Sequence, residues 1–256
     1  MKKLLPLTAF FSALLSASVA LAGGGGAHLM HVDTDMNDQG SLQNGAKLFV
    51  NYCLSCHSAS FMRFNRMGKD LGLTDEQVKE NLMFTTDKVG NTMEIAMDSS
   101  DAERWFGVTP PDLSVISRAR GSDWLYTYFL SFYKDDSKPL GINNLVFKDV
   151  GMPHVLGDLQ GGIPEPVYKT VKDDKGHEHQ VIEKVAVPKG SMSDSEYAKL
   201  NADYERNVRD LVNFLEYMGE PAKMVRYSLG VKVILFLLLL FIFAFALKKE
   251  YWKDIH

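Results

Sequence analysis

The stretch Cys53-Leu54-Ser55-Cys56-His57 holds both cysteines of the 256-residue chain and decides what can fold around it. Two thiols at this spacing can each add to one of two neighbouring vinyl groups on one edge of a porphyrin. The histidine that follows then lies under the ring, where it can bind iron. C-x-x-C-H is a specific signal for c-type haem attachment. The sequence therefore predicts one haem c, covalent through Cys53 and Cys56, with His57 as an iron ligand.

Other uses of a C-x-x-C pair fit less well. An exported protein could join the two cysteines in a disulfide. A thioredoxin-like redox pair usually follows a strand, whereas residues 41–52 have a helical pattern with Ala46, Phe49 and Val50 on one side. A zinc site would need further cysteine or histidine ligands at matching spacing.

Residues 1–22 have the pattern of a secretory signal peptide. Lys2 and Lys3 form a positive start, an apolar stretch rich in small residues follows, and Ala20-Leu21-Ala22 fits the A-x-A cleavage pattern. An uncleaved N-terminal membrane anchor is the alternative, which the small residues weaken. We therefore expect the chain to be exported.

A second apolar segment lies near the other end. Val233 to Leu247 is unbroken, and extension back through Tyr227 gives the roughly 20 residues that span a bilayer. A buried core helix is the alternative interpretation of such a run. We expect a transmembrane helix over residues 225–248, followed by a cytoplasmic tail over residues 249–256.

Charges around this segment predict its orientation. Lys248, Lys249 and Lys253 lie just past the span, so the positive-inside rule places them in the cytoplasm. Residues 23–224 would then form a periplasmic domain held at the bacterial inner membrane. The two terminal segments contain six of the 28 basic and two of the 32 acidic residues, which leaves 22 and 30 and a net charge near −8. An acidic domain attracts basic partners, although solubility alone explains the charge equally well.

The second axial ligand decides what the haem does. A five-coordinate iron leaves room for peroxide, oxygen or nitric oxide, whereas methionine ligation is usual in electron transfer. Met152 is the preferred candidate, because Gly151 permits close approach to the ring and Pro153 fixes the turn. The alternative ligands are Met83, Met93 and Met97, with His154 as a second choice.

Further motifs accompany the haem motif. Their sequences are Pro110-Pro111-Asp112-Leu113-Ser114, Arg118-Ala119-Arg120-Gly121 and Gly151-Met152-Pro153, with Asp123 to Tyr128 and Asn143 to Phe147 between them. Together with the C-terminal apolar run, they make residues 30–255 resemble the cytochrome c1 family, the haem subunit of quinol–cytochrome c oxidoreductase, in its proteobacterial form.

The resemblance implies roles for individual residues. Met152 would be the sixth ligand, and Pro110 and Pro111 would pack on the haem face beside His57. Arg120 would pair with a haem propionate, since a guanidinium suits a bidentate, charge-assisted contact. Tyr126 would lie near the haem, although the Trp124-Leu125-Tyr126 run could simply be core. A single proline follows Met152 where the mitochondrial motif has two, so contacts of the second proline are not carried over.

The resemblance also implies a function. The chain would carry single electrons from the Rieske iron–sulfur subunit to a soluble basic cytochrome c, next to a cytochrome b subunit in the membrane. It would have no catalytic residues of its own, and no nucleic-acid partner is expected. The alternatives are another membrane-anchored c-type cytochrome, or a haem enzyme or sensor with an open sixth site.

The expected fold is mainly α: a cytochrome c-like haem domain with a small β-hairpin insert and one C-terminal transmembrane helix. Helices are predicted to begin at Thr74, to run from Ser122 or Asp123 through Tyr133, and to end at Gly219. Cytochrome c folds cross their first and last helices, so the resemblance implies that Gly45 and Phe49 meet the Leu211/Leu215 face, with Gly45 allowing close approach. Residues 164–188, with Asp173-Asp174-Lys175-Gly176 at the turn, would form the hairpin as a surface flap.

Overall fold

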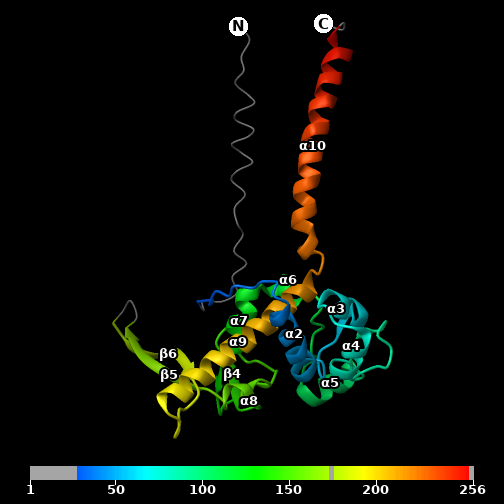
Figure 1. Ribbon diagram of the computed structural model, residues 1–256. Helices are drawn as coiled ribbons and strands as arrows, with labels where there is room; N and C mark the ends of the chain where they lie inside the picture. The colour runs from blue at the N-terminus through cyan, green and yellow to red at the C-terminus, as the bar shows by residue number, and fades with distance from the viewer. Residues whose placement is uncertain (1–27, 173–175, 254–256) are drawn as a thin grey trace.

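Two helices from opposite ends of the chain cross at the centre of the fold. They are α2 (Gln39–Leu48) and α9 (Asp194–Gly219) (Figure 1). The computed structural model describes residues 28–172 and 176–253. The expected signal peptide over residues 1–22 and most of the predicted hairpin turn lie outside these residues.

The crossing is close because Gly45 has no side chain. A Cβ added at Gly45 would lie 2.1 Å from the backbone oxygen of Asp210 and 2.6 Å from Cβ of Phe214. One turn further along, the rings of Phe49 and Phe214 meet with their centroids 5.6 Å apart. The predicted crossing of the first and last helices, with Gly45 at the contact, is therefore confirmed.

Helix α9 forms one side of the hydrophobic core. Its start is fixed by a capping box, in which Ser193 and Glu196 each accept a hydrogen bond from the other's backbone N–H. Val208, Leu211, Val212 and Leu215 recur at helical spacing and are all buried. The helix ends at Gly219, as predicted.

The remaining elements are short and surround this pair. The helices are α3 (Phe64–Asp70), α4 (Asp75–Asn81), α5 (Ser99–Phe106), α6 (Ile116–Arg120), α7 (Ser122–Leu130) and α8 (Gly157–Gln160). The strands pair antiparallel as β1 (Ala59–Arg63) with β2 (Thr92–Met93), and β3 (Phe132–Lys134) with β4 (Ile142–Asn144). Thr74 caps α4, as predicted, with Gln77 completing a capping box.

Helix α7 differs from the prediction at both ends. Neither Ser122 nor Asp123 caps it; the Ser122 hydroxyl donates to Glu216, and the Asp123 carboxylate accepts from the backbone N–H of Val32. The helix stops at Leu130, and Tyr133 belongs to β3, where it pairs with Asn143. Aromatic residues suit strands as well as helices, and the pairing of β3 with β4, the next strand along the chain, ended the helix early.

The predicted hairpin insert is present as β5 (Glu165–Lys172) and β6 (Glu178–Ala186), which pair antiparallel. Most of its residues are exposed, and its base lies against β3. It projects from the domain on the opposite side from α5 (Figure 1). The insert therefore forms a surface flap away from the described core.

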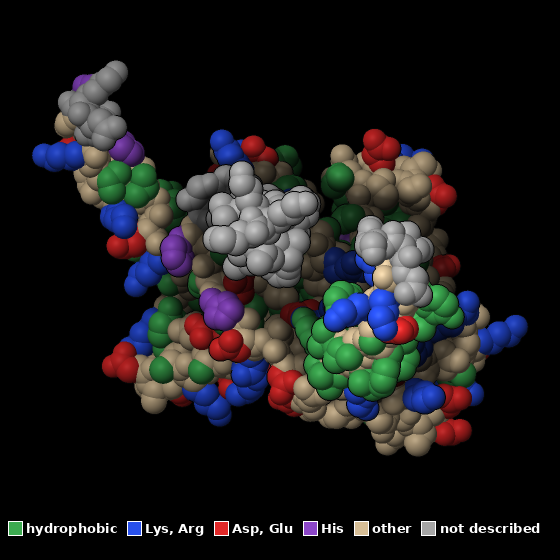
Figure 2. Space-filling model, turned by 90° about the horizontal axis from the view of Figure 1, so that it is seen from above, with side chains coloured by type: hydrophobic (Ala, Val, Ile, Leu, Met, Phe, Trp, Pro, Cys, Tyr) green, Lys and Arg blue, Asp and Glu red, His purple; other side chains and the backbone are tan. Residues whose placement is uncertain are grey.

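Helix α10 (Lys223–Tyr251) extends from the domain, and none of its residues is buried. It is somewhat longer at both ends than the predicted span of residues 225–248. Its most apolar stretch of 18 residues has a mean hydropathy of 2.8, and among the described residues it is the one helix that is long and apolar enough to cross a membrane. Seen end-on, it presents hydrophobic side chains on all sides, with basic side chains near its end (Figure 2).

Replacement of Gly45 by alanine should destabilise the protein. The new Cβ would force α2 and α9 apart, and we expect the free energy of unfolding to fall by about 1–3 kcal/mol. Thermal and chemical unfolding of the full haem-loaded chain in detergent, followed by circular dichroism, measures this loss. Gly40→Ala in the same helix is the control, because its Cβ would meet only the Asp38 side chain, at 3.4 Å. Equal stability of the two variants would contradict the close crossing.

Candidate haem site

A cavity of about 660 Å³ opens beside the end of α2. It is bounded by the haem motif, by the chain from Phe106 to Pro111, by α7, and by residues 147–155. Cys53, Cys56, His57, Pro110, Pro111, Arg120 and Met152 all line it. The fold thus brings seven of the eight predicted site residues together, although they come from four separate segments.

The local backbone places the haem motif on one wall. After α2 the chain widens into a π-helical turn over Phe49–Cys53, a distortion that often occurs at functional sites. The backbone N–H groups of Cys56 and His57 both donate to the Cys53 carbonyl, at 3.0 and 2.9 Å. Neither cysteine is in a disulfide, and burial raises the pKa of Cys53 to about 12. Both sulfurs are therefore available for thioether bonds.

The orientation of His57 suits an iron ligand. Its Nδ1 lies 2.7 Å from the backbone carbonyl oxygen of Pro111. A carbonyl only accepts, so Nδ1 carries the proton and Nε2 keeps a lone pair for a metal. Burial lowers the pKa of His57, which favours the neutral imidazole that metals bind.

The Pro110–Ser114 loop is fixed against the segment that follows His57. Asp112 accepts from the backbone N–H of Ser60 at 2.9 Å and from its hydroxyl at 2.7 Å. The backbone N–H of Leu113 donates to the Ser58 carbonyl at 2.8 Å. These bonds hold the Pro111 carbonyl in place, and with it the imidazole of His57.

Met152 lines the cavity, and its alternatives do not. Met83 and Met93 are buried in the core, and Met97 is half-buried outside the cavity lining. The His154 Nε2 lies 2.7 Å from Oε1 of Gln160, and its ring stacks on Phe132. The Met152 sulfur accepts a hydrogen bond from the hydroxyl of Tyr128 at 3.4 Å. Of the candidate iron ligands, Met152 alone lies where its side chain can reach a group bound in the cavity.

Arg120 holds its guanidinium over aromatic rings at the cavity edge. Its Cζ lies 4.9 Å from the ring centre of Trp124 and 5.9 Å from that of Phe147. Such cation–π contacts position the charge without neutralising it. Within residues 28–172 and 176–253, no carboxylate forms a salt bridge with it. The charge is therefore available to an anionic group of a ligand.

Tyr126 is the one predicted site residue that does not line the cavity. Its ring is half-buried against the core, and burial together with Glu205 raises the pKa of its hydroxyl. Trp124 and Tyr128 of the same helix line the cavity instead. Residues four apart share one face of a helix, so the 124/128 spacing was the signal that could have identified them.

This donor set fits a c-type haem. Two thiols, one imidazole nitrogen and one thioether sulfur share the walls of one cavity, with a free guanidinium at its edge. The remaining wall is mainly apolar, as expected of a cofactor site. It includes Val108, Leu113, Ile116, Leu125, Phe129 and Val155.

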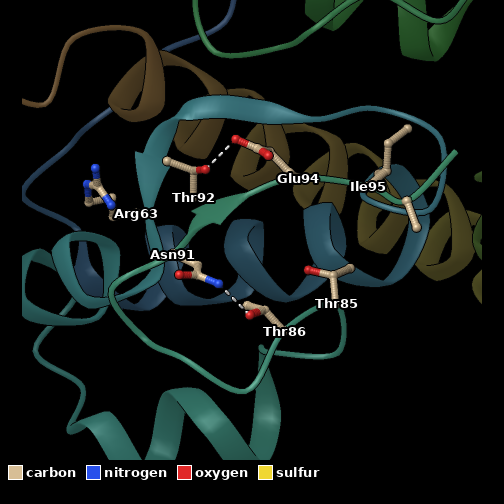
Figure 3. Close-up of a pocket in the computed structure, with 8 residues that line it drawn as sticks. Arg63, Thr85, Thr86, Asn91, Thr92, Glu94 and Ile95 are labelled. Atoms are coloured by element: carbon tan, nitrogen blue, oxygen red, sulfur yellow. Dashed lines mark hydrogen bonds between the residues drawn. The ribbon is translucent and has the colours of Figure 1, made fainter. Parts of the chain in front are cut away.

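A second hollow, of about 460 Å³, lies between β2 and the preceding loop (Figure 3). Its lining is mainly polar, and several of the groups bind one another. Asn91 donates to the Thr86 hydroxyl at 2.7 Å, and the Thr92 hydroxyl donates to Glu94 at 2.5 Å. It contains no thiol, imidazole or thioether, so it does not fit the haem.

Comparison with known proteins agrees with this site. The Cytochrome C1 family matches residues 31–255. Cytochrome c1 of Allochromatium vinosum is 48% identical over 246 residues, which are 95% of this chain and 96% of that protein. A Nitrosomonas europaea protein named ammonia monooxygenase gamma subunit is 46% identical, with 95% of each chain covered. Cytochrome c1 of Rhodospirillum rubrum is 25% identical over 95% of this chain and 97% of its own length.

The residues that match the family include the haem motif, the residues that line the cavity and the long apolar helix. The chain belongs to the cytochrome c1 family.

Proposed function

We propose that this chain accepts one electron from a Rieske iron–sulfur protein and passes it to a soluble basic cytochrome c. Family membership makes the chain a membrane-anchored c-type haem carrier of the quinol–cytochrome c oxidoreductase, with one covalent haem. The observation that best supports the finer proposal is the single cavity shared by Cys53, Cys56, His57 and Met152. Ligation of the iron by both a methionine and a histidine would favour electron transfer over reactions at an open iron.

Each residue has a distinct part in this proposal. The bound haem supplies a centre that gains and loses one electron. Cys53 and Cys56 would hold it covalently, and His57, oriented by the Pro111 carbonyl, would bind its iron. Met152 would supply the second protein ligand to the iron, and Arg120 would pair with a propionate. The apolar walls exclude water, and we assign no acid or base step to any lining residue; oxidation of quinol belongs to the complex.

Met152→Ala should remove the sixth ligand. We expect the haem to stay attached through its thioethers, to become high-spin, to bind carbon monoxide readily, and to lose the weak red-edge band of methionine ligation. Absorption spectra of the purified complex measure this change. Met97→Leu, which removes a sulfur outside the cavity, should leave the spectrum unchanged. A native protein that is already high-spin and binds carbon monoxide would instead favour a haem enzyme or sensor.

An acidic edge supports a basic electron acceptor. Helix α5 ends in Phe106, which lines the cavity, and it carries Asp101 and Glu103 with Asp98 at its N-cap. Arg104 is its one basic residue and is paired with Asp101. Together with the net charge near −8 expected of the exported domain, this edge would attract a positively charged partner and speed the encounter.

Quinol-driven reduction of a basic cytochrome c by the purified complex tests both ends of this route. The haem should be reduced only when the Rieske protein is present. Glu103→Lys should slow transfer to the acceptor by roughly threefold or more at low salt, and the difference should vanish as ionic strength rises. Glu183→Lys on the distant hairpin is the matched charge control. A rate independent of salt, or equal slowing by both variants, would contradict a docking edge on α5.

We further propose that the haem domain is periplasmic and that the end of α10 lies in the cytoplasm. Lys248 and Lys249 occupy the last turn of α10, as the positive-inside rule requires of a cytoplasmic end. At the other end, Arg226 is paired with Glu220, so it contributes less net charge there. This arrangement places the haem in the compartment of soluble cytochromes c.

Reporter fusions test the orientation. A fluorescent protein that folds only in the cytoplasm, fused after His256, should fluoresce, whereas alkaline phosphatase at the same point should be inactive. The same reporters fused after Ala222, before α10, should give the opposite pattern. Active phosphatase after His256 would reverse the proposed topology.

A further inference from the structure

Tyr128 contacts the proposed sixth ligand directly. Its hydroxyl lies 3.4 Å from the Met152 sulfur, within hydrogen-bond range for a sulfur acceptor. The thioether has no hydrogen to give, so the hydroxyl is the donor. A thioether sulfur has two lone pairs, and this bond occupies one and leaves the other for iron. This contact is a feature of the chain's own residues, whatever occupies the cavity.

The hydroxyl is held in place by the packing of its ring. The ring of Tyr128 stacks on Trp124, with centroids 5.1 Å apart and planes 10° apart. Phe132 meets it edge-on at 4.9 Å, and Phe129 at 5.4 Å. The residue is 7% exposed. With two rotatable bonds and contacts on several sides, the phenol cannot follow a mobile partner, so it fixes the sulfur.

The backbone at Tyr128 is fixed as well. Its carbonyl accepts from the Asn144 side-chain amide at 2.8 Å, and Asn144 is itself buried in β4. Met152, in contrast, has a flexible, unbranched side chain on an irregular segment. The rigid partner in the pair is therefore the tyrosine.

We propose that Tyr128 is a positioning residue that holds the Met152 sulfur and raises the reduction potential of the haem. The proposal rests on Met152 being the sixth ligand. Donation to one lone pair withdraws electron density from the sulfur and makes it a poorer donor to iron. Because the oxidised iron needs that density more, the bond favours the reduced state. Hydrogen bonds to axial ligands are a recognised means of tuning a haem.

Tyr128→Phe removes the hydroxyl and keeps the ring. One lost hydrogen bond should shift the redox equilibrium toward the oxidised form by roughly two- to tenfold, where tenfold corresponds to about 59 mV for one electron. The measurement is a redox titration of the haem in the purified complex. The red-edge band should persist, because Met152 still reaches the iron. A shift of the redox equilibrium below about 1.5-fold is smaller than the loss of one hydrogen bond would cause, and it would overturn the proposal.

Tyr217→Phe is the matched control. It removes the hydroxyl of another buried tyrosine, which donates to Asp70 at 2.8 Å, and neither residue lines the cavity. Both variants should lose some thermal stability, but Tyr128→Phe alone should change the potential. An equal change in both would mean that Tyr128 acts only through stability and would overturn its tuning role.

A double-mutant cycle tests whether the effect passes through the sulfur. In a Met152→His background the coordinating nitrogen has no second lone pair, so Tyr128→Phe should shift the potential much less. An equal shift in both backgrounds would overturn the proposal. A different result would show that Met152 is not the sixth ligand: the red-edge band would then survive Met152→Ala.

Discussion

The close contact between Gly45 and the Asp210 carbonyl is the constraint on which the remaining structure depends. It places α2 directly against α9, where a Cβ would keep them apart. Helix α2 leads through the π-helical turn into the haem motif, and α9 leads into α10. The segment that attaches the haem and the segment that leads to the membrane helix are far apart in the sequence, and they thus pack together at one helix crossing.

Buried polar groups then fix the register of this crossing. Asp210 accepts from the Ser41 hydroxyl at 2.8 Å and from the Asn44 amide at 2.9 Å. The Asn213 amide donates to Ser41 and to the backbone carbonyl of Asp35. Apolar side chains alone would tolerate sliding of one helix along the other. A buried carboxylate does not, because a shift would remove both of its donors from α2 in a region of low dielectric.

The sequence predicted best what depends on local chemistry or on a motif. The haem motif and the capping of α4 are of this kind, as is the mainly helical fold. The crossing at Gly45 joins segments far apart in the chain, and the resemblance to a cytochrome c fold predicted it. Two predictions around α7 depended on what this segment packs against. Its C-terminal end was set by the pairing of β3 with β4, the next strand along the chain, because the aromatic residues there suit a strand as well as a helix. The position of α9 decides which side of α7 faces the cavity. Trp124 and Tyr128 lie on that side, whereas Tyr126 was the predicted residue.

Helix α7 also joins the cavity to the membrane anchor. At its first residue, the Ser122 hydroxyl donates to Glu216, which also accepts from Thr34 and from Lys223 at the start of α10. Burial would raise the pKa of Glu216, but these donors outweigh it and the pKa is lowered, so the carboxylate is charged at neutral pH. Two turns later, Tyr128 contacts Met152. One short helix therefore connects the ligand side of the cavity with the anchor. Since electron transfer within a complex depends on a fixed position of the haem relative to its partners, this rigid connection suits a membrane-bound carrier better than a flexible tether would.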